Sequence, residues 1–309
     1  MLRPLTVLSA PSNLGLMPPA NGREPGVRRM PTVLLAHGLL DGLAVQSVAT
    51  VAPPPYGFGV DPETGVRNAE AIRAYTLRLA TTIEAAVAGG SLVVVLGGDC
   101  SILLGAMLGL RRWGDVGLIF VDGHRDFQTP ETSATGGAAG MDLALATGRG
   151  PALLTHFDGA ERLVRDEAVV VLGHRDQTSG VADGSSGIEG TSIARLDLDA
   201  IRQFSPAGAA AEALAVIQRS GAAGFWIHVD ADVLSSDVMP AVDSPQPGGL
   251  SYDELRALLV PLLQSDLAMG LEVTIYDPDR DPSGEVGRAF AACLRGVLAE
   301  AGGAARDGA

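Results

Sequence analysis

The sequence predicts an α/β fold in which one mainly parallel sheet lies between two layers of helices. Short runs of β-forming residues alternate with longer stretches of helical period, which is the pattern of parallel strands joined by crossover helices. The strand runs are solidly apolar rather than alternating, so both faces of the sheet should be covered. Neither a composition shift nor an internal repeat divides the 309 residues, and we therefore expect one domain over residues 1–309.

Seven strands and four helices can be placed from this pattern. The strands are expected, in chain order, at Leu5–Ala10, Leu43–Val51, Leu92–Leu96, Val116–Val121, Ala168–Leu172, Phe225–Val229 and Leu271–Ile275. Asn68–Ala88 has apolar residues at 72, 75, 79, 83 and 87, close to the spacing of one helix face. The other helices are Ser101–Arg111, Ser251–Gln264, which Ser251 would cap, and Glu285–Ala299. The expected loops are Pro11–Pro31, Gln177–Gly190 and the tail from Gly302.

Composition excludes several classes of protein. A hydrophobic content of 47% supplies a sizeable core, and a formal charge of −14 argues against binding to nucleic acid. Two distant cysteines, Cys100 and Cys293, do not make a disulfide framework, which favours a reducing compartment. No apolar run approaches the ~20 residues that span a bilayer, and no signal peptide core is present. We therefore expect a cytoplasmic protein with no membrane partner.

Metal-binding side chains are concentrated where four of the strands end. One strand runs into Gly-Gly-Asp-Cys, a second ends in D-x-H-x-D, a third ends in D-x-D, and the fourth carries a glutamate. Taken singly, the D-x-D and the Gly-Gly-Asp can be ordinary turns, and the glutamate can simply pair with an arginine. The D-x-H-x-D behind a clean strand is the rarer pattern. The candidates are Cys100, Asp122, His124, Asp126, Asp230, Asp232 and Glu272.

The first three of these motifs should meet at one place, because ligands bind beyond the carboxyl ends of parallel strands. Residues two apart on an extended segment point the same way, so each motif can direct its side chains at a common point. Several carboxylates gathered in a cleft would repel one another strongly without cations. Two divalent metals bridged by carboxylates resolve this repulsion. By contrast, we expect His228 to point away from the neighbours of Asp230 and to support the core rather than bind metal.

Together, the motifs resemble the signatures of the ureohydrolase family, which comprises the arginases, agmatinases, formiminoglutamases and their relatives. The family's G-G-D-H appears here as Gly97-Gly-Asp-Cys100, its D-A-H-x-D as Asp122-Gly-His-Arg-Asp126, and its S-x-D-x-D as His228-Val-Asp-Ala-Asp232. The segment Pro11–Pro31 is similar to the family's opening loop, so the resemblance covers nearly the whole chain. It implies the three-layer α/β/α sandwich of the arginase-like fold.

The resemblance also implies a role for each candidate. Asp122 and Asp230 would bridge two metals, His124 and Asp232 would hold the second metal, and Asp126 would hold the first. Cys100 stands where relatives have a histidine on the first metal, so it would be a substituted ligand. The ions would be Mn²⁺, with Fe, Co, Ni or Zn admitted by the softer thiolate. The alternative for Cys100 is a buried thiol beside a single tight metal.

For catalysis, the resemblance implies that Asp126 accepts a hydrogen bond from the bridging hydroxide and that Glu272 grips the substrate's guanidinium group. Besides Cys100, three positions depart from the relatives. Ala139 stands where many have a proton-shuttling histidine, Gln128 replaces an asparagine, and Thr178 replaces the aspartate that binds the α-amino group in arginases. Gln128 and Thr178 thus remain substrate-binding candidates, but an arginine-specific site is disfavoured.

These observations predict a binuclear metal hydrolase that cleaves the C–N bond of a small cationic guanidino compound, giving urea or a urea analogue and an amine. Two metals supply hydroxide at neutral pH, which the resonance-stabilised guanidinium requires. The altered residues Cys100 and Ala139 keep an alternative open, a metal-poor relative that acts as an oligomeric regulator or scaffold. The resemblance implies a homo-oligomer, either a trimer or a hexamer.

Overall fold

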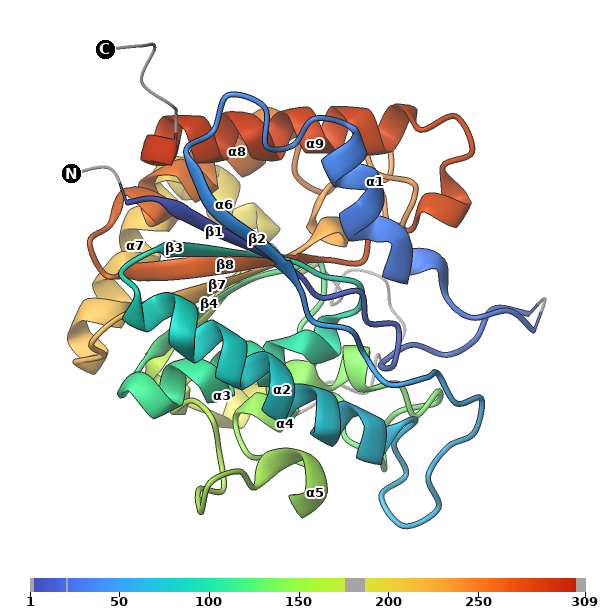
Figure 1. Cartoon of the computed structure of the whole chain (residues 1–309). Helices are drawn as coiled ribbons and strands as arrows, with labels where there is room; N and C mark the ends of the chain where they lie inside the picture. The colour runs from blue at the N-terminus through green and yellow to red at the C-terminus, as the bar shows by residue number, and fades with distance from the viewer. Residues whose placement is uncertain (1–2, 21, 176–186, 304–309) are drawn as a thin grey trace.

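The computed structural model describes residues 3–20, 22–175 and 187–303. Figure 1 shows a sheet edge-on through the middle of the molecule, with α1, α6, α8 and α9 on one side and α2 to α5 on the other. This arrangement confirms the predicted α/β sandwich with a helical layer on each face of the sheet.

Within the described residues, eight strands form one sheet in the order β2-β1-β3-β8-β7-β4-β5-β6. Every neighbouring pair is parallel, so all the carboxyl ends lie along the same edge. The strands are β1 (Leu5–Ser9), β2 (Val45–Thr50), β3 (Leu92–Leu96), β4 (Gly117–Val121), β5 (Val169–Leu172), β6 (Ala194–Leu196), β7 (Phe225–Asp230) and β8 (Ala268–Thr274). The four strands with candidate metal or substrate residues, β3, β8, β7 and β4, are adjacent at the centre of the sheet.

The α-helices of the described chain connect these strands and cover the sheet. They are α1 (Met30–Ala36), α2 (Ala69–Ala88), α3 (Leu103–Trp113), α4 (Asp142–Ala146), α5 (Ala152–Thr155), α6 (Leu198–Phe204), α7 (Pro206–Ser220), α8 (Tyr252–Gln264) and α9 (Glu285–Leu298). Ser251 caps the start of α8 as predicted, and it does so in a capping box, with Ser251 accepting from the backbone of Glu254 and Glu254 accepting from the backbone of Ser251.

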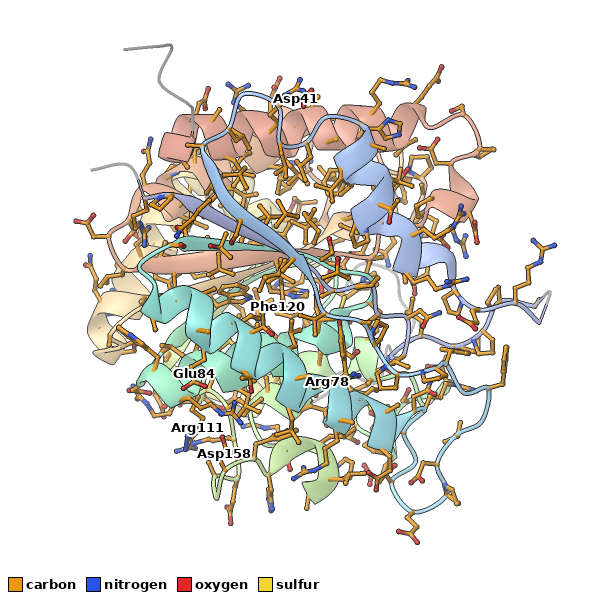
Figure 2. All side chains as sticks on the ribbon, in the orientation of Figure 1. Asp41, Arg78, Glu84, Arg111, Phe120 and Asp158 are labelled. Carbon is orange, nitrogen blue, oxygen red and sulfur yellow. The ribbon has the colours of Figure 1, made fainter. Side chains whose placement is uncertain are left out.

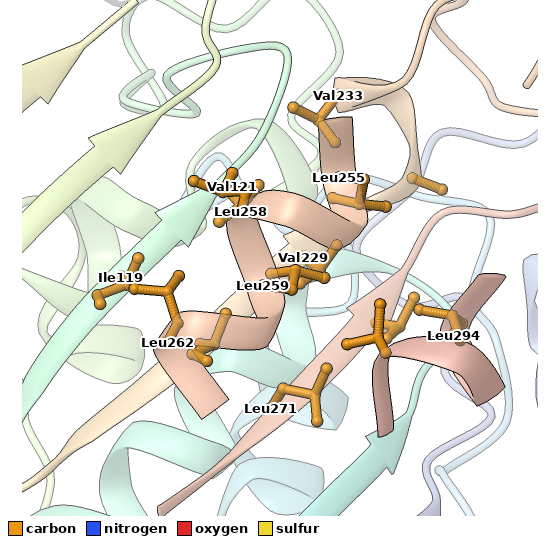
Figure 3. Close-up of a cluster of buried hydrophobic side chains, with 14 of the residues drawn as sticks. Ile119, Val121, Val229, Val233, Leu255, Leu258, Leu259, Leu262, Leu271 and Leu294 are labelled. Carbon is orange, nitrogen blue, oxygen red and sulfur yellow. The ribbon is translucent and has the colours of Figure 1, made fainter. Parts of the chain in front are cut away.

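Alternate side chains of each central strand enter two separate cores. Val94 and Leu96 of β3 join the core beneath α1 and α6–α9, whereas Val93 and Val95 join the core above α2–α5. Figure 3 shows the first core, where the leucines of α8 pack over Ile119, Val121, Val229 and Leu271. Because both faces bury apolar side chains, the strands are apolar at every position rather than alternating. Figure 2 shows charged side chains such as Asp41 and Glu84 at the periphery, while Phe120 lies inside.

Several elements were not predicted from the sequence. Strand β6 and helices α1 and α4–α7 lie in stretches where the sequence pattern predicts no element or, for the start of α1, within the expected loop Pro11–Pro31. Most of the expected loop Gln177–Gly190 and the end of the tail from Gly302 lie outside the described residues. Among the described residues, no helix combines the length and the apolar character needed to cross a membrane.

Candidate metal centre

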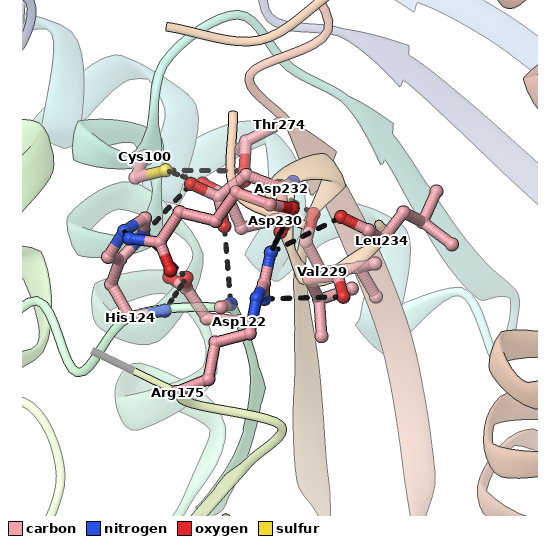
Figure 4. A network of polar contacts seen from close by, with 12 residues as sticks. Cys100, Asp122, His124, Arg175, Val229, Asp230, Asp232, Leu234 and Thr274 are labelled. Carbon is pink, nitrogen blue, oxygen red and sulfur yellow. Dashed lines mark hydrogen bonds and ion pairs between the residues drawn. The ribbon is translucent and has the colours of Figure 1, made fainter. Parts of the chain in front are cut away.

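A cavity of about 560 Å³ opens at the carboxyl ends of the central strands. Its walls near the strand ends include Cys100 after β3, His124 and Asp126 after β4, and Asp230 and Asp232 at the end of β7. The parallel sheet therefore brings together residues that are up to 132 positions apart in the sequence, between Cys100 and Asp232. Figure 4 shows most of these side chains converging on one point.

The end of β4 supplies Asp122, whose side chain is fully buried. Asp122 Oδ1 accepts a hydrogen bond from the His124 amide at 2.7 Å, while Oδ2 has no hydrogen-bond partner. His124 Nδ1 lies 2.9 Å from Asp232 Oδ2, and its Nε2 lies 2.9 Å from Gln246 Nε2. A buried carboxylate oxygen without a partner is costly, and a cation is one way to compensate it.

The end of β7 carries the second pair of carboxylates. Asp230 Oδ1 accepts from the Asp232 amide at 2.7 Å, and Oδ2 accepts from the Cys100 thiol at 2.9 Å. The Gly123 amide donates to Asp232 Oδ1 at 3.2 Å, which ties the end of β4 to the end of β7. The spacing of the two aspartates therefore comes from backbone hydrogen bonds within the turns rather than from flexible side chains.

Among the described residues, three groups of potential ligand atoms occur here. Within each group, the atoms lie within 4.8 Å of one another. One contains Asp122, His124 and Asp232, and another contains Asp122, Asp126 and Asp230. Asp122 belongs to both, as a bridging carboxylate between two ions would. A third group contains Cys100, His228 and Asp230.

The electrostatics of the cluster favour cations. Burial, followed by the neighbouring carboxylates, raises the pKa of Asp122 and of Asp230 well above the usual range. The Asp232 carboxylate raises the pKa of His124 to about 10. Burial and the nearby Asp230 also raise the pKa of the Cys100 thiol. Without metal, protons would neutralise much of this site, and divalent ions would take their place.

Asp99, the neighbour of Cys100, has a different task. Its carboxylate accepts from the Ser12 hydroxyl at 2.6 Å, the Gly15 amide at 3.1 Å and the Ser101 amide at 2.9 Å. It thereby fastens the opening loop, which forms part of the cavity wall through Gly15, to the end of β3. Gly98 allows this close approach, since a Cβ there would lie 1.7 Å from the Ser12 carbonyl oxygen.

Glu272 does not line the cavity, contrary to the prediction that it grips the substrate. It is fully buried on β8, and its Oε1 lies 2.7 Å from Nδ1 of His228. In the sheet register, Thr274 pairs with Asp230 while Glu272 pairs with His228, two residues deeper along the strands. Ile275, with a φ of 75°, and Asp277 reach the cavity from this strand end instead.

His228 also differs from its prediction. Because it lies two residues before Asp230 on an extended strand, both side chains project from the same face. Its ligand nitrogen falls within 4.8 Å of the Cys100 sulfur and an Asp230 oxygen, so it points toward the cluster rather than away. A count of positions along β7 would have given this orientation from the sequence.

The structure locates two of the three remaining positions that the sequence analysis singled out. Gln128 and Ala139 line the cavity, whereas Thr178 lies outside the described residues.

Sequence reasoning missed Arg175, which follows β5 and is buried behind the cluster. Its Nη2 donates to the carbonyls of Asp232 at 2.8 Å and Gln246 at 3.2 Å, and so holds the turn after β7 in place (Figure 4). Its position just after an apolar strand was the available signal.

Comparisons with known proteins identify the family of this chain. The Arginase family model matches residues 23–299. The chain belongs to the arginase family. An arginase from Brevibacillus brevis is 30% identical over 224 residues, which cover 72% of this chain and 74% of that arginase. The crystal structure of an arginase from Bacillus cereus superimposes with a TM-score of 0.82 at 26% identity, covering 96% of this chain and 98% of that one.

Membership of the arginase family confirms both the suspected resemblance and the enzyme class, a ureohydrolase acting on C–N bonds of amidines. The fold alone is shared more widely within this group. The structure of a formimidoylglutamase from Bacillus subtilis has a TM-score of 0.75 at 18% identity, covering 97% of this chain and 87% of that one.

Proposed function

We propose that this arginase-family protein hydrolyses the C–N bond of a small cationic guanidino compound at a centre of two divalent metals, giving urea or a urea analogue and an amine. The observation that carries the proposal is the sharing of Asp122 between two groups of ligand atoms at the floor of an acidic cavity. A single group of ligand carboxylates would hold one ion. A carboxylate that belongs to two such groups can bridge two ions.

The residues present fit such a pair of ions. His124 and Asp232 would hold one ion, Asp126 and Cys100 the other, and Asp122 and Asp230 would bridge them. The unpartnered Asp122 Oδ2 and the raised pKa values of the buried carboxyls are the features that cations would satisfy. When bound, two such metals lower the pKa of a coordinated water enough to supply hydroxide near neutral pH.

The chain's own residues then bind and orient the reactants. Asp126 faces the cavity and would accept a proton from the attacking water. A guanidinium and one water yield urea and a protonated amine, so both protons that the water loses go to the leaving nitrogen and no other reagent is needed. Since Ala139 offers no acid, Asp126 is also the group we assign to pass these protons, one at a time, to the leaving nitrogen.

A cationic substrate needs a carboxylate beside the metal ligands that remains available to it, and Glu272 does not line the cavity. Asp243 and Asp277 both line the cavity, and neither belongs to the groups of potential ligand atoms. Asp277 already interacts with Arg280, at 3.7 Å between Oδ2 and Nε, while Asp243 is exposed to the cavity. We therefore assign Asp243 as the carboxylate that orients the guanidinium group over the metals.

The test is a substrate screen with the full-length protein, stripped with a chelator and reloaded with Mn²⁺ or Co²⁺. Guanidino compounds with neutral, cationic and acidic tails, together with a formimino compound, are assayed for urea, formamide and amine release. We expect turnover with at least one compound and its loss, by about 10³-fold or more, in Asp232→Asn.

Asp41→Asn is the matched control, because this acid is 78% exposed, lies at the top edge of the molecule in Figure 2 and does not line the cavity. It should turn over at the wild-type rate. If no compound in the panel is cleaved with either metal while both ions bind, the proposed activity is wrong.

A further inference from the structure

We propose that Cys100, His228 and Asp230 together form a mixed sulfur, nitrogen and oxygen site for a metal ion, with Glu272 orienting the imidazole, and that this site selects a softer ion than Mn²⁺. The inference deepens the proposed function, on which it rests, by adding His228 to the ligands of the first of the two metals. The ligands predicted from the sequence do not include this histidine, and the family assignment does not add it.

The geometry of the three ligand atoms supports the site. The Cys100 sulfur, a His228 nitrogen and an Asp230 oxygen lie within 4.8 Å of one another, the sulfur 2.9 Å from Asp230 Oδ2. The three residues are at most 2% exposed. An ion could enter from the cavity, because Cys100 and Asp230 line it while His228 lies behind them.

The surroundings of His228 fix its ring and leave one ring nitrogen, Nε2, available to a metal. Its Nδ1 is taken by Glu272 Oε1 at 2.7 Å, and its ring stacks on Phe120 with a centroid distance of 4.5 Å and an angle of 9°. Its Nε2 is fully buried and has no hydrogen-bond partner. A carboxylate that accepts from one ring nitrogen leaves the lone pair of the other free for a metal, an arrangement typical of histidine ligands.

This arrangement also accounts for two residues that the hydrolytic chemistry does not use. A buried histidine and a buried glutamate in the middle of adjacent strands are expensive to place there for packing alone. With His228 as the ligand and Glu272 as the carboxylate that orients it, the site gains the imidazole nitrogen that Cys100 does not provide.

The donor set decides which ion is favoured. Coordination replaces the thiol proton that now lies between Cys100 and Asp230, so binding releases one proton to solvent and leaves a thiolate. Thiolate and imidazole favour Zn²⁺, Co²⁺ or Fe²⁺, whereas the remaining ligands, mostly carboxylates, also suit Mn²⁺. We therefore expect a mixed centre in which the two positions differ in metal preference.

The test is a Co²⁺ titration of the chelator-stripped, reduced full-length protein, followed by optical absorption. The wild type should show a near-ultraviolet thiolate-to-cobalt charge-transfer band. Cys100→Ser should lose this band, and His228→Asn should shift the visible cobalt bands and weaken cobalt binding. Glu272→Gln should keep the charge-transfer band but bind cobalt about 10- to 100-fold more weakly.

Two matched variants control for the loss of any thiol or imidazole. Cys293→Ser removes the other cysteine and His156→Asn an exposed histidine, and both should reproduce the wild-type spectrum. If His228→Asn does not fold, the paramagnetically shifted NMR signals of the wild-type cobalt protein decide instead, with two coordinated imidazoles expected from His124 and His228.

A wild-type protein without the charge-transfer band, an unchanged cobalt spectrum in His228→Asn, or a single coordinated imidazole would overturn the proposal. Each of these results leaves the proposed hydrolysis standing, because turnover is measured separately as product release. Conversely, absence of turnover with an intact cobalt spectrum would refute the activity and not the site.

Discussion

Asp243 is a single residue on which substrate affinity should depend. It is exposed to the cavity, where limited hydration raises its pKa to about 6, and the nearby Asp232 carboxylate adds to this shift. Removing its charge while keeping its shape should weaken binding of the guanidinium group more than it slows the chemistry. We expect Asp243→Asn to raise KM about 10- to 100-fold, the value of a charged hydrogen bond, with a smaller change in kcat.

Steady-state kinetics on the substrate identified by the screen would check this split. Asp237→Asn, which alters an exposed acid on the same connection outside the cavity, should leave KM unchanged. A wild-type KM in Asp243→Asn would mean that another group binds the cation.

His174 should make the fold sensitive to acid. Burial, followed by the charge of Arg125, lowers the pKa of His174 from 6.5 to about 4. Between these values the unfolded chain binds the proton and the folded chain does not, so stability is lost as pH falls from 6.5 toward 4. We expect His174→Asn to remove up to about 3 kcal/mol of this loss, measured by urea unfolding at pH 7 and pH 4.5 in chelator.

The exposed His156 provides the comparison, since His156→Asn should keep the wild-type dependence on pH. Parallel pH profiles for wild type and His174→Asn would show that His174 titrates in the folded protein much as it does in the unfolded chain.

At the scale of elements, the junction of β3 with the opening loop depends on one glycine. The Ser12 carbonyl accepts from the Asp99 amide at 3.2 Å, and the Gly98 carbonyl accepts from the Ile275 amide at 2.7 Å. Because a Cβ at Gly98 would overlap the Ser12 carbonyl oxygen, Gly98→Ala must separate the loop from the strand. We expect it to lower the free energy of unfolding by about 3 kcal/mol, measured by urea unfolding.

Gly59→Ala is the matched change, since no atom lies within 4 Å of a Cβ at that position. It should be close to neutral. A similarly small effect for Gly98→Ala would show that the opening loop can move away without cost.

The elements that the sequence predicted are those with long apolar runs or strong helical periodicity. Strand β6 was missed because Ala194–Leu196 has three residues, too few to show a pattern. Helix α7 was missed because alanines, Ala209, Ala210 and Ala213, make up most of its buried face and give weak contrast with its exposed face. The boundaries of α2 and α8 were predicted closely, since large aliphatic side chains line one face of each.

The same limit applies to the site. Motifs at strand ends predicted that Asp122, His124, Asp230 and Asp232 would lie close together, because strand direction alone decides it. Glu272 was misplaced because its depth along β8 depends on the register with β7, which the sequence does not encode locally.

At the scale of the whole molecule, the cluster is a local concentration of negative charge within a chain of net charge −14. Binding of cations to the folded state alone should therefore stabilise the entire protein. We expect Mn²⁺ or Co²⁺ at 100 times its Kd to add about 2.7 kcal/mol, and EDTA to remove it, seen as a shift in Tm. Asp232→Asn should lose most of the shift and Asp41→Asn none; equal shifts in all three proteins would place the stabilising ion elsewhere.

The order of strands in the sheet has a consequence for biosynthesis. Strand β8, the last in sequence among the described residues, lies between β3 and β7 at the centre of the sheet. During translation, β1 and β3 can pair early, and β7 can join β4 once it emerges, but these two half-sheets stay unjoined until residue 274 has left the ribosome. Pairings over such long sequence separations fold slowly, and the exposed half-sheets would depend on chaperones. Cys100 and Asp230 belong to different halves, so the proposed metal centre would form only after the two half-sheets have joined.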